Sequence, residues 1–443
     1  MKLYQYTLHG WVNPADVFIS LFGNDEYAFW LDREYHATAR FSIIGHAYGG
    51  EVANIAKARA AVEAGIPDLV SEANFVSKFC PGFVGWIDYP KKVLPSYVDD
   101  LDSLPATLLE VREALVFDHD RRHLSLVGRF ETEEAFEHWV QGVLLRLALA
   151  GGEQASFKHR NKPGEVSEVS LRHSRDEYLA LIEKAKAHIA AGDVYQLCLT
   201  NEITLTAEAN PLEVFLRLRA QSSAPYSSFI RAGSKVLVSA SPEQFLSIST
   251  DGLVQTKPIK GTRRRSQDAA IDAQLASELA FNEKERAENL MIVDLMRNDL
   301  SKFSVQDSVQ VAKLFHVESY ASVHQLVSTV QSHLAAGENP VDALVSAFPG
   351  GSMTGAPKLR AQQLICDFEN GERGVYSGVS GVIGLDGSIE MSMNIRCLVF
   401  EGDQVRIGVG GGITADSDPQ AEFEETKLKA QSLLSVLGTS WVW

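Results

Sequence analysis

The sequence predicts an α+β protein in which layers of antiparallel strands alternate with helices. Short runs rich in β-branched residues, separated by turn residues, lie at residues 194–206, 227–232, 235–241, 245–249 and 253–257. Such spacing favours antiparallel pairing. The same pattern returns near the C-terminus with helical stretches in between, which argues against a parallel doubly wound sheet.

Helix signals are clearest after residue 170. Ser174 and Glu177 stand at the spacing of a capping box, and Gly192 ends the helix that they begin. Further helices are expected at residues 133–150, 272–300, 339–348, 356–370 and 418–437, and further strands at 376–384, 388–400 and 404–414. Residues 150–168 are polar and contain Gly and Pro, which predicts a boundary between an N-terminal region, 1–150, and a second domain, 165–440.

Composition limits the classes of function. The chain has 443 residues, is 45% hydrophobic and carries a net charge of −16, which argues against general affinity for nucleic acid or anionic membranes. No apolar run approaches the roughly 20 residues that span a bilayer. The four cysteines, which show no paired spacing, indicate a reducing, cytoplasmic setting: Cys80, Cys198, Cys366 and Cys397.

Lys260 lies in a stretch stiffened by proline, downstream of a hairpin signal. Asp251-Gly252 between two strand-like runs predicts a two-residue turn. In that register Glu243 falls opposite Lys260. A surface ion pair is the ordinary interpretation. The alternative is an acid beside a nucleophilic amine, because desolvation and nearby cations can lower the pKa of such an amine.

Two helical stretches each carry a pair of carboxylates. Glu285 and Glu288 are three residues apart, as are Glu422 and Glu425, and Lys429 shares the face of the second pair. A solvated helix face is the usual meaning of such a pattern. The alternative is an Mg²⁺ site, because this ion takes one or two protein carboxylates and keeps waters.

A glycine run ends the strand expected at residues 404–414. Glycines 408, 410, 411 and 412 precede the signals that begin the last helix, and a plain turn explains such a run as well as an anion site does. Turns on either side of residues 388–400 place Arg396 in a middle strand, near Ser377 and Val409. An arginine beside free backbone amides is typical of a carboxylate site.

Seven motifs in a fixed order resemble one family, the chorismate-utilising enzymes, which include component I of anthranilate synthase and of aminodeoxychorismate synthase. The resemblance covers roughly residues 170 to 435, and residues 29–45 are similar to the family's N-terminal region more loosely. The motifs are SPE, PIKGTRRR, NEKERAENLMIVDLMRNDL, VHQLVSTV, PGGSMTGAPK, RGVYSGVSG and GGGITADSDPQAEFEETKLKA. The resemblance implies a layered sandwich of two antiparallel sheets flanked by helices, with an active-site cleft between its halves.

Lys260 distinguishes branches of this family. In anthranilate synthases the stretch that corresponds to residues 258–262 is similar to Pro-Ile-Ala-Gly-Thr. A lysine at the position of Lys260 is typical of aminodeoxychorismate synthases. The resemblance implies that the Lys260 amine attacks C2 of chorismate, that Glu243 protonates the departing C4 hydroxyl, and that ammonia then enters at C4. It implies that His324 lies near that hydroxyl. Gln196 stands where salicylate-forming relatives carry a lysine that activates water, so the resemblance favours ammonia as the nucleophile.

The resemblance also implies Mg²⁺, with Glu288 and Glu425 as ligands and with Glu422 and Glu285 holding metal-bound waters. It assigns a further set of residues to the substrate, which are Arg396, the amides of Gly410 and Gly412, Lys429, Tyr376 and Ser352.

A glutaminase partner on a separate chain is expected, because no cysteine lies in a Gly-x-Cys-x-Gly elbow. The implied product, 4-amino-4-deoxychorismate, leads to 4-aminobenzoate and folate. Two alternatives remain. One is an anthranilate-forming or other chorismate-converting enzyme, and the other is a non-catalytic subunit that binds chorismate or tryptophan.

Overall fold

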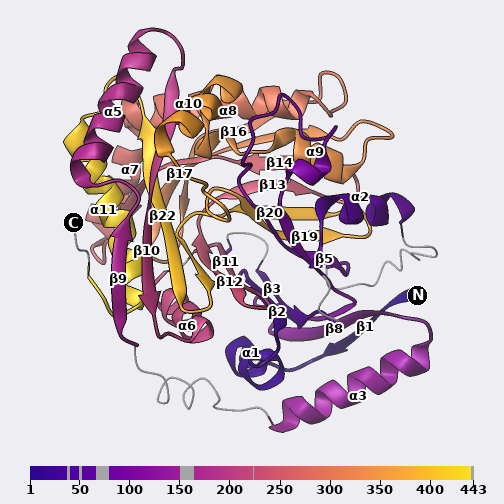
Figure 1. Ribbon diagram of the computed structural model, residues 1–443. Coiled ribbons are helices and arrows are strands. Elements are labelled where there is room, and N and C mark those ends of the chain that lie inside the picture. Colours follow the sequence, from indigo (N-terminus) through magenta and orange to yellow (C-terminus); the bar gives the residue numbers. More distant parts are fainter. Residues whose placement is uncertain (37–39, 49–51, 66–78, 150–163, 223, 441–443) are drawn as a thin grey trace.

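Two large antiparallel sheets stack face to face, and helices cover their outer faces (Figure 1). The computed structural model describes residues 1–36, 40–48, 52–65, 79–149, 164–222 and 224–440. Every strand pair in this part of the chain is antiparallel, so the expected α+β sandwich is confirmed.

The first sheet has twelve strands. In spatial order they are β1 (Lys2–Leu8), β8 (His123–Phe130), β7 (Glu113–Asp118), β3 (Phe41–His46), β2 (Tyr27–Asp32), β11 (Tyr226–Ala232), β12 (Lys235–Ser241), β21 (Cys397–Glu401), β22 (Gln404–Ile413), β10 (Gln196–Ala207) and β18 (Gly355–Ala356), with β9 (Val166–Leu171) also paired to β10.

The second sheet has ten strands. They are β15 (Ile259–Arg264), β17 (Val323–His333), β14 (Leu253–Lys257), β13 (Gln244–Ile248), β20 (Ile389–Met393), β19 (Val379–Gly384), β5 (Gly82–Ile87), β6 (Ala106–Glu110) and β4 (Val52–Ala53), with β16 (Gln310–Ser319) also paired to β17.

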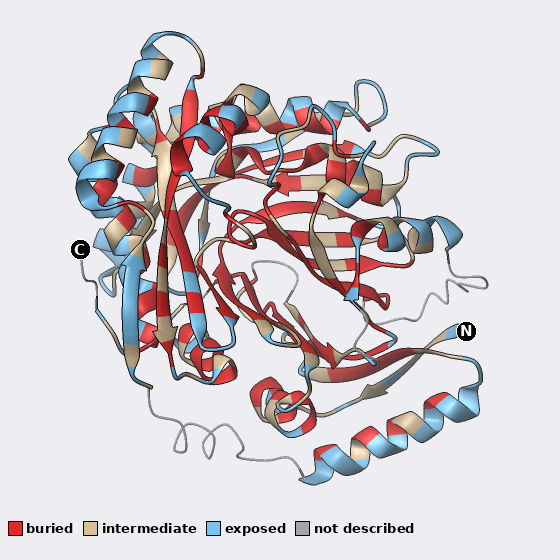
Figure 2. Ribbon diagram, viewed as in Figure 1, coloured by how far each residue is buried: buried red, intermediate tan, exposed pale blue. Residues whose placement is uncertain are grey.

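Both sheets combine strands from the two regions expected on either side of residues 150–168. β2 pairs with β11 in the first sheet, and β5 pairs with β19 in the second. Residues 150–163 of the expected boundary lie outside the described residues. Phe29, Trp86 and Met391, from both sheets, belong to one buried apolar cluster, so the main core lies between the sheets. Figure 2 shows this buried interior and the exposed outer faces of the helices.

The helices in the described part of the chain are α1 (Pro14–Phe22), α2 (Ile55–Ala64), α3 (Glu133–Leu149), α5 (Arg175–Ala190), α6 (Pro211–Gln221), α7 (Ala269–Phe281), α8 (Glu283–Ser301), α9 (Pro340–Ala347), α10 (Lys358–Glu369) and α11 (Pro419–Val436). Five of the expected helices, α3, α5, α9, α10 and α11, lie close to their predicted bounds, whereas α1, α2 and α6 were not expected from the sequence. The capping box of Ser174 and Glu177 is present. No helix in the described ranges is long and apolar enough to cross a membrane.

The stretch expected as one helix at residues 272–300 is two helices. Asn282 takes an extended conformation, ends α7 and caps α8 by accepting a hydrogen bond from the amide of Glu285. An asparagine competes with the helix for such local hydrogen bonds, which favours a break at this position.

The hairpin expected around Asp251-Gly252 has a different register. Ile248 pairs with Val254, so residues 250–252 form a three-residue turn with Gly252 at φ +82°. The two-residue turn was therefore wrong. β15 leaves this hairpin and pairs with β17, where Lys260 faces Leu326, so Glu243 and Lys260 are not partners across one hairpin.

The single strand expected at residues 388–400 is also wrong. β20 belongs to the second sheet and β21 to the first, and the chain crosses between the sheets at Arg396, which has φ +51°. A non-glycine residue held in this region is strained and is often found at a functional site. Arg396 therefore lies at the crossing and not in a middle strand.

Phe229 tests whether the two regions form one cooperative unit. It is fully buried, and its ring packs against Phe18 (centroids 5.5 Å apart) from the N-terminal region and Phe215 (5.8 Å) from α6. We expect Phe229→Ala to lower the free energy of unfolding by about 3–5 kcal/mol in urea, in a single transition.

The control is Leu145→Ala on α3, where the side chain is 68% exposed and the change should stay within about 0.5 kcal/mol. Two separate transitions, only one of them moved by Phe229→Ala, would contradict the expectation.

Candidate active site

One cavity of about 560 Å³ gathers the predicted residues from both sheets and from α8 and α11. This volume lies within the range of about 300–1,000 Å³ typical of small-molecule sites. Every site residue expected from the sequence lines it, with the exception of His324: Glu243, Lys260, Glu285, Glu288, Ser352, Tyr376, Arg396, Gly410, Gly412, Glu422, Glu425 and Lys429.

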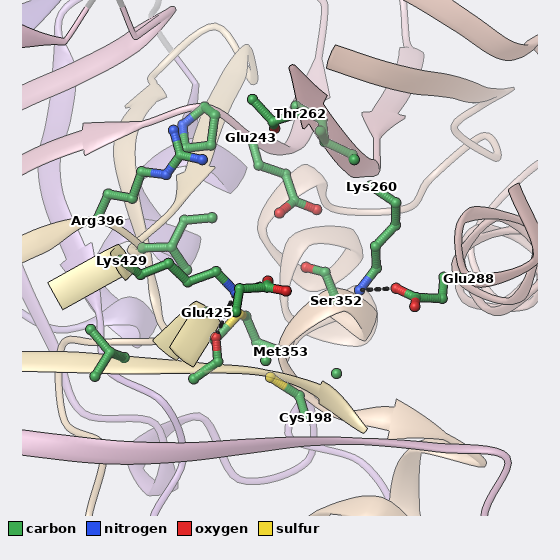
Figure 3. Close-up of a pocket in the computed structure, with 18 of the residues that line it drawn as sticks. Cys198, Glu243, Lys260, Thr262, Glu288, Ser352, Met353, Arg396, Glu425 and Lys429 are labelled. Carbon is green, nitrogen blue, oxygen red and sulfur yellow. Dashed lines mark hydrogen bonds and ion pairs between the residues drawn. The ribbon is translucent and has the colours of Figure 1, made fainter. Parts of the chain in front are cut away.

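Glu243 and Lys260 point into this cavity from different strands (Figure 3). Glu243 is 6% exposed, just before β13. Burial raises the pKa of Glu243 to about 7, although nearby Lys260, the Ser352 hydroxyl and Arg396 act to lower it. A carboxyl group with this pKa can hold a proton near neutral pH and donate it to a departing group.

The Lys260 amine lies in the cavity between Glu243 and the carboxylates of α8 and α11 (Figure 3). Its Nζ is 3.9 Å from Oε2 of Glu288 on α8, and Figure 3 shows that contact. The amine also approaches the backbone of β22, since a Cβ on Gly412 would lie 3.4 Å from Nζ and 2.4 Å from Nε2 of Gln196. Only glycine leaves this space open.

The carboxylates of α8 and α11 face each other across the cavity. Glu285 is paired with Arg263 at 2.9 Å. Lys284 Nζ lies 3.9 Å from Glu288 and 3.7 Å from Glu422. The pairs expected from spacing alone therefore converge in three dimensions, and lysine ammonium groups lie among them.

The carboxylates of Glu288, Glu422 and Glu425 are the candidate ligands for a divalent cation in this cavity. Burial raises the pKa of Glu288, and Glu422 and Glu425 raise it further against the effect of Lys260 and Lys284. Lys429, 2.8 Å away, lowers the pKa of Glu425. Among the described residues, no three His, Cys, Asp or Glu side chains are close enough to hold an ion as they stand. The carboxylate oxygens fit Mg²⁺ in kind.

The amides of Gly410 and Gly412 are available to a ligand. Cys198 N donates to Thr354 O, and Thr200 N donates to a buried carboxylate of α10, both at 2.8 Å. These two residues of β10 face Gly412 and Gly410 on β22. Opposite residues in an antiparallel ladder exchange both hydrogen bonds or neither. The glycine N–H groups therefore point away from β10, along the edge that faces the cavity.

Arg396 reaches the same cavity from the crossing between the sheets (Figure 3). Burial lowers the pKa of its guanidinium, and Glu243 opposes this effect. In the described part of the chain no side chain makes a hydrogen bond or ion pair with it. A buried guanidinium beside free amides is a site for a carboxylate. Ser377 is close to the crossing, since its amide donates to Asn394 O at 2.9 Å, and Val409 lines the cavity as expected.

His324 does not line the cavity. It is buried on the other face of β17, where it bonds Ser319 (2.8 Å) and Asp272 (3.0 Å). Its neighbour Gln325 lines the cavity instead. Successive side chains of a strand point to opposite faces, so the alternation along β17 was the signal that could have identified Gln325.

Gln196 is fully buried, and neither polar atom of its side-chain amide has a hydrogen-bond partner. Sequence reasoning missed Cys198, Thr262 and Met353, which also line the cavity. No local pattern marks them, because strand pairing brings Cys198 and Thr262 to the cavity, and the short helical turn 351–353 brings Met353 there, only in the folded chain.

Comparison with known proteins places these observations in context. Residues 26–435 match the model of a family described as chorismate binding enzyme. The chain is 39% identical over 456 residues to an aminodeoxychorismate synthase of Streptomyces griseus, with 96% of this chain covered. It spans only 62% of the length of that relative.

Two further similarities concern anthranilate synthase. Component 1 of that enzyme from Streptomyces coelicolor is 33% identical, with 99% of this chain and 89% of the relative covered. The crystal structure of component I from Streptococcus pneumoniae has a TM-score of 0.73 at 24% identity and covers 97% of this chain and 92% of that one. The structural likeness supports the shared fold.

Proposed function

We propose, because the chain belongs to the chorismate binding enzyme family, that it is component I of an aminodeoxychorismate synthase and aminates chorismate at C4. The observation that carries the proposal is the Lys260 amine in one cavity with Glu243, whose pKa is raised by burial to about 7. The product, 4-amino-4-deoxychorismate, would supply 4-aminobenzoate and folate synthesis.

Lys260 acts as the nucleophile and Glu243 as the general acid. The neutral amine attacks C2 of chorismate, the ring double bond shifts, and the C4 hydroxyl leaves as water with the proton of Glu243. Ammonia then attacks C4, the double bond shifts back, the bond from C2 to the lysine nitrogen breaks, and the new ammonium group returns a proton to Glu243. The net reaction exchanges a hydroxyl for an amino group and releases water.

Chorismate carries two carboxylates, and the cavity offers two places for them. Arg396 with the amides of Gly410 and Gly412 binds one, and Lys429 adds a cation nearby. Tyr376 also lines the cavity, where its ring lies against Gly408 of β22. The other carboxylate faces the acidic residues of α8 and α11, which repel it unless a cation intervenes.

Mg²⁺ is the proposed cofactor, held by Glu288 and Glu425, with Glu422 and Glu285 in support. When bound, it neutralises the ring carboxylate and orients the ring. Glu285 already bonds Arg263, so it acts at longer range, and Lys284 must leave the space between Glu288 and Glu422.

Ammonia is proposed to come from a separate glutaminase chain in the cytoplasm. Three of the four free cysteines, Cys80, Cys198 and Cys397, are buried, and burial raises the pKa of each. A thiol whose pKa is raised in this way is a poor nucleophile. Nothing in this chain's described cysteines therefore supports its own hydrolysis of glutamine.

The similarity to anthranilate synthase component 1 over 99% of the chain favours one alternative, amination at C2. In that case Lys260 would be incidental. A purely regulatory subunit is less well supported, because the acid, the amine, the carboxylates and Arg396 all meet in one cavity.

The position of amination tests the proposal. Chorismate with Mg²⁺ and ammonium should give the 4-amino product, and chorismate without ammonia should give an adduct on the peptide that contains Lys260, detected by mass spectrometry. Lys260→Ala should abolish the adduct and lower the rate of C4 amination by at least about 100-fold, with any residual product aminated at C2. NMR assigns the site. Undiminished 4-amino product from Lys260→Ala contradicts the nucleophile role.

The pH dependence tests Glu243. The proton must be present on Glu243 to leave with the hydroxyl, so kcat should fall about tenfold per pH unit above about 7, provided that the free ammonia concentration is held constant. Glu243→Gln should lose activity at every pH. A parent whose kcat is level from about pH 6 to about pH 9 is incompatible with this role.

Metal binding tests the carboxylates. Glu288→Gln and Glu425→Gln should each weaken Mg²⁺ binding, measured by calorimetry in the presence of chorismate. Loss of a residue that only hydrogen-bonds a metal ligand typically weakens binding about 10–100-fold, and loss of a ligand itself should weaken it more. Glu424→Gln is the control, because Glu424 lies beside Glu425 on α11 but outside the cavity. If Glu288→Gln or Glu425→Gln binds Mg²⁺ with the affinity of the parent, the ligand assignment is wrong.

A further inference from the structure

A second cavity adjoins the active-site cavity. It has a volume of about 350 Å³, and it shares Pro242, Gln325 and Arg396 with the larger one. Its outer end is formed by exposed side chains, among them Arg264 and Ser322. None of the four carboxylates of α8 and α11 lines it. It is therefore a separate approach to the same interior, on a side remote from the proposed metal.

Gln325 stands where the two cavities meet. Its side chain is 1% exposed, and Oε1 is buried without a hydrogen-bond partner. A buried amide oxygen without a donor is unfavourable, so such an atom marks a place where a donor molecule fits. The proposed amination mechanism gives this oxygen no task.

The charges along the second cavity select a neutral molecule. Arg264 lies at the outer end and Arg396 at the inner end, and no described residue that lines the cavity is acidic. Arg396 also lines the larger cavity, where Figure 3 shows it together with Glu243. Arg264, with no acidic residue lining the described part of this cavity, repels ammonium, whereas neutral ammonia passes and can donate an N–H to Oε1 of Gln325.

We propose that the second cavity is the entry route for neutral ammonia, and that Oε1 of Gln325 accepts a hydrogen bond from it where the cavities meet. The inference rests on the proposed function, since only an amination consumes ammonia. A separate route lets ammonia arrive after chorismate and the cation have filled the larger cavity. The hydrogen bond to Gln325 also holds the nitrogen beside the larger cavity until C4 is open to attack.

Ser322→Trp tests the route, because it places a large ring at the outer end without changing a buried residue. We expect kcat/KM for ammonia to fall about tenfold while the KM for chorismate stays within about twofold. The matched control is Ser96→Trp, another exposed serine at a cavity that shares no residue with the active site. It should leave both constants unchanged.

Gln325→Met tests the acceptor, since methionine has a similar length and no amide oxygen. It should lower kcat/KM for ammonia about tenfold, with chorismate binding, measured by calorimetry, within about twofold of the parent. Both variants should make the same 4-amino product as the parent.

The outcomes separate the route from the reaction. A parent that forms no 4-amino product from chorismate and ammonium overturns the proposed function and the route together. If the parent is active and neither Ser322→Trp nor Gln325→Met lowers kcat/KM for ammonia, the route alone is overturned. If Ser322→Trp raises the KM for chorismate as much as that for ammonia, the second cavity is the substrate entrance, and the inference is also overturned.

Discussion

A buried ion pair between Arg373 and Glu369 fixes the floor of the active-site cavity. Both side chains are 1% exposed and lie 2.6 Å apart. Arg373 also donates to Met353 O (2.6 Å) and Cys198 O (2.8 Å), while Glu369 accepts the amide of Thr200 (2.8 Å). Removing one partner of such a pair leaves an uncompensated buried charge, which strongly destabilises the fold. They join α10, β10 and the loop that contains Met353.

The rest of the site depends on this anchoring. Because the amides of Cys198 and Thr200 are used on the side of β10 away from β22, the opposite glycines keep their own N–H groups for the cavity. The same edge of β22 is open because β21 turns away toward the crossing at Arg396. Guanidinium and amides thus meet at one of the places where the chain passes from one sheet to the other.

Some site residues could be identified from short sequence patterns, and others could not. The spacing of three residues predicted that Glu285 and Glu288 share one face of a helix. Both line the cavity from α8, because helix geometry is set by hydrogen bonds within the helix itself. Strand alternation would have placed Gln325 in the cavity and His324 outside it. The prediction that Glu243 pairs with Lys260 across the hairpin was wrong, because a single extra residue in the turn shifts every pair along the hairpin.

The sequence by itself determined many of the elements, some of their ends, such as the capping box of α5, and the α+β class, because these depend on hydrogen bonds and periodicities within a few residues. The motifs, which cover roughly residues 170–435, also identified the family, whose model matches residues 26–435. Tertiary structure alone decided that β15 pairs with β17 and that residues 388–400 divide between two sheets. Strand pairing is non-local, and its outcome depends on which surfaces the folded chain can bury together.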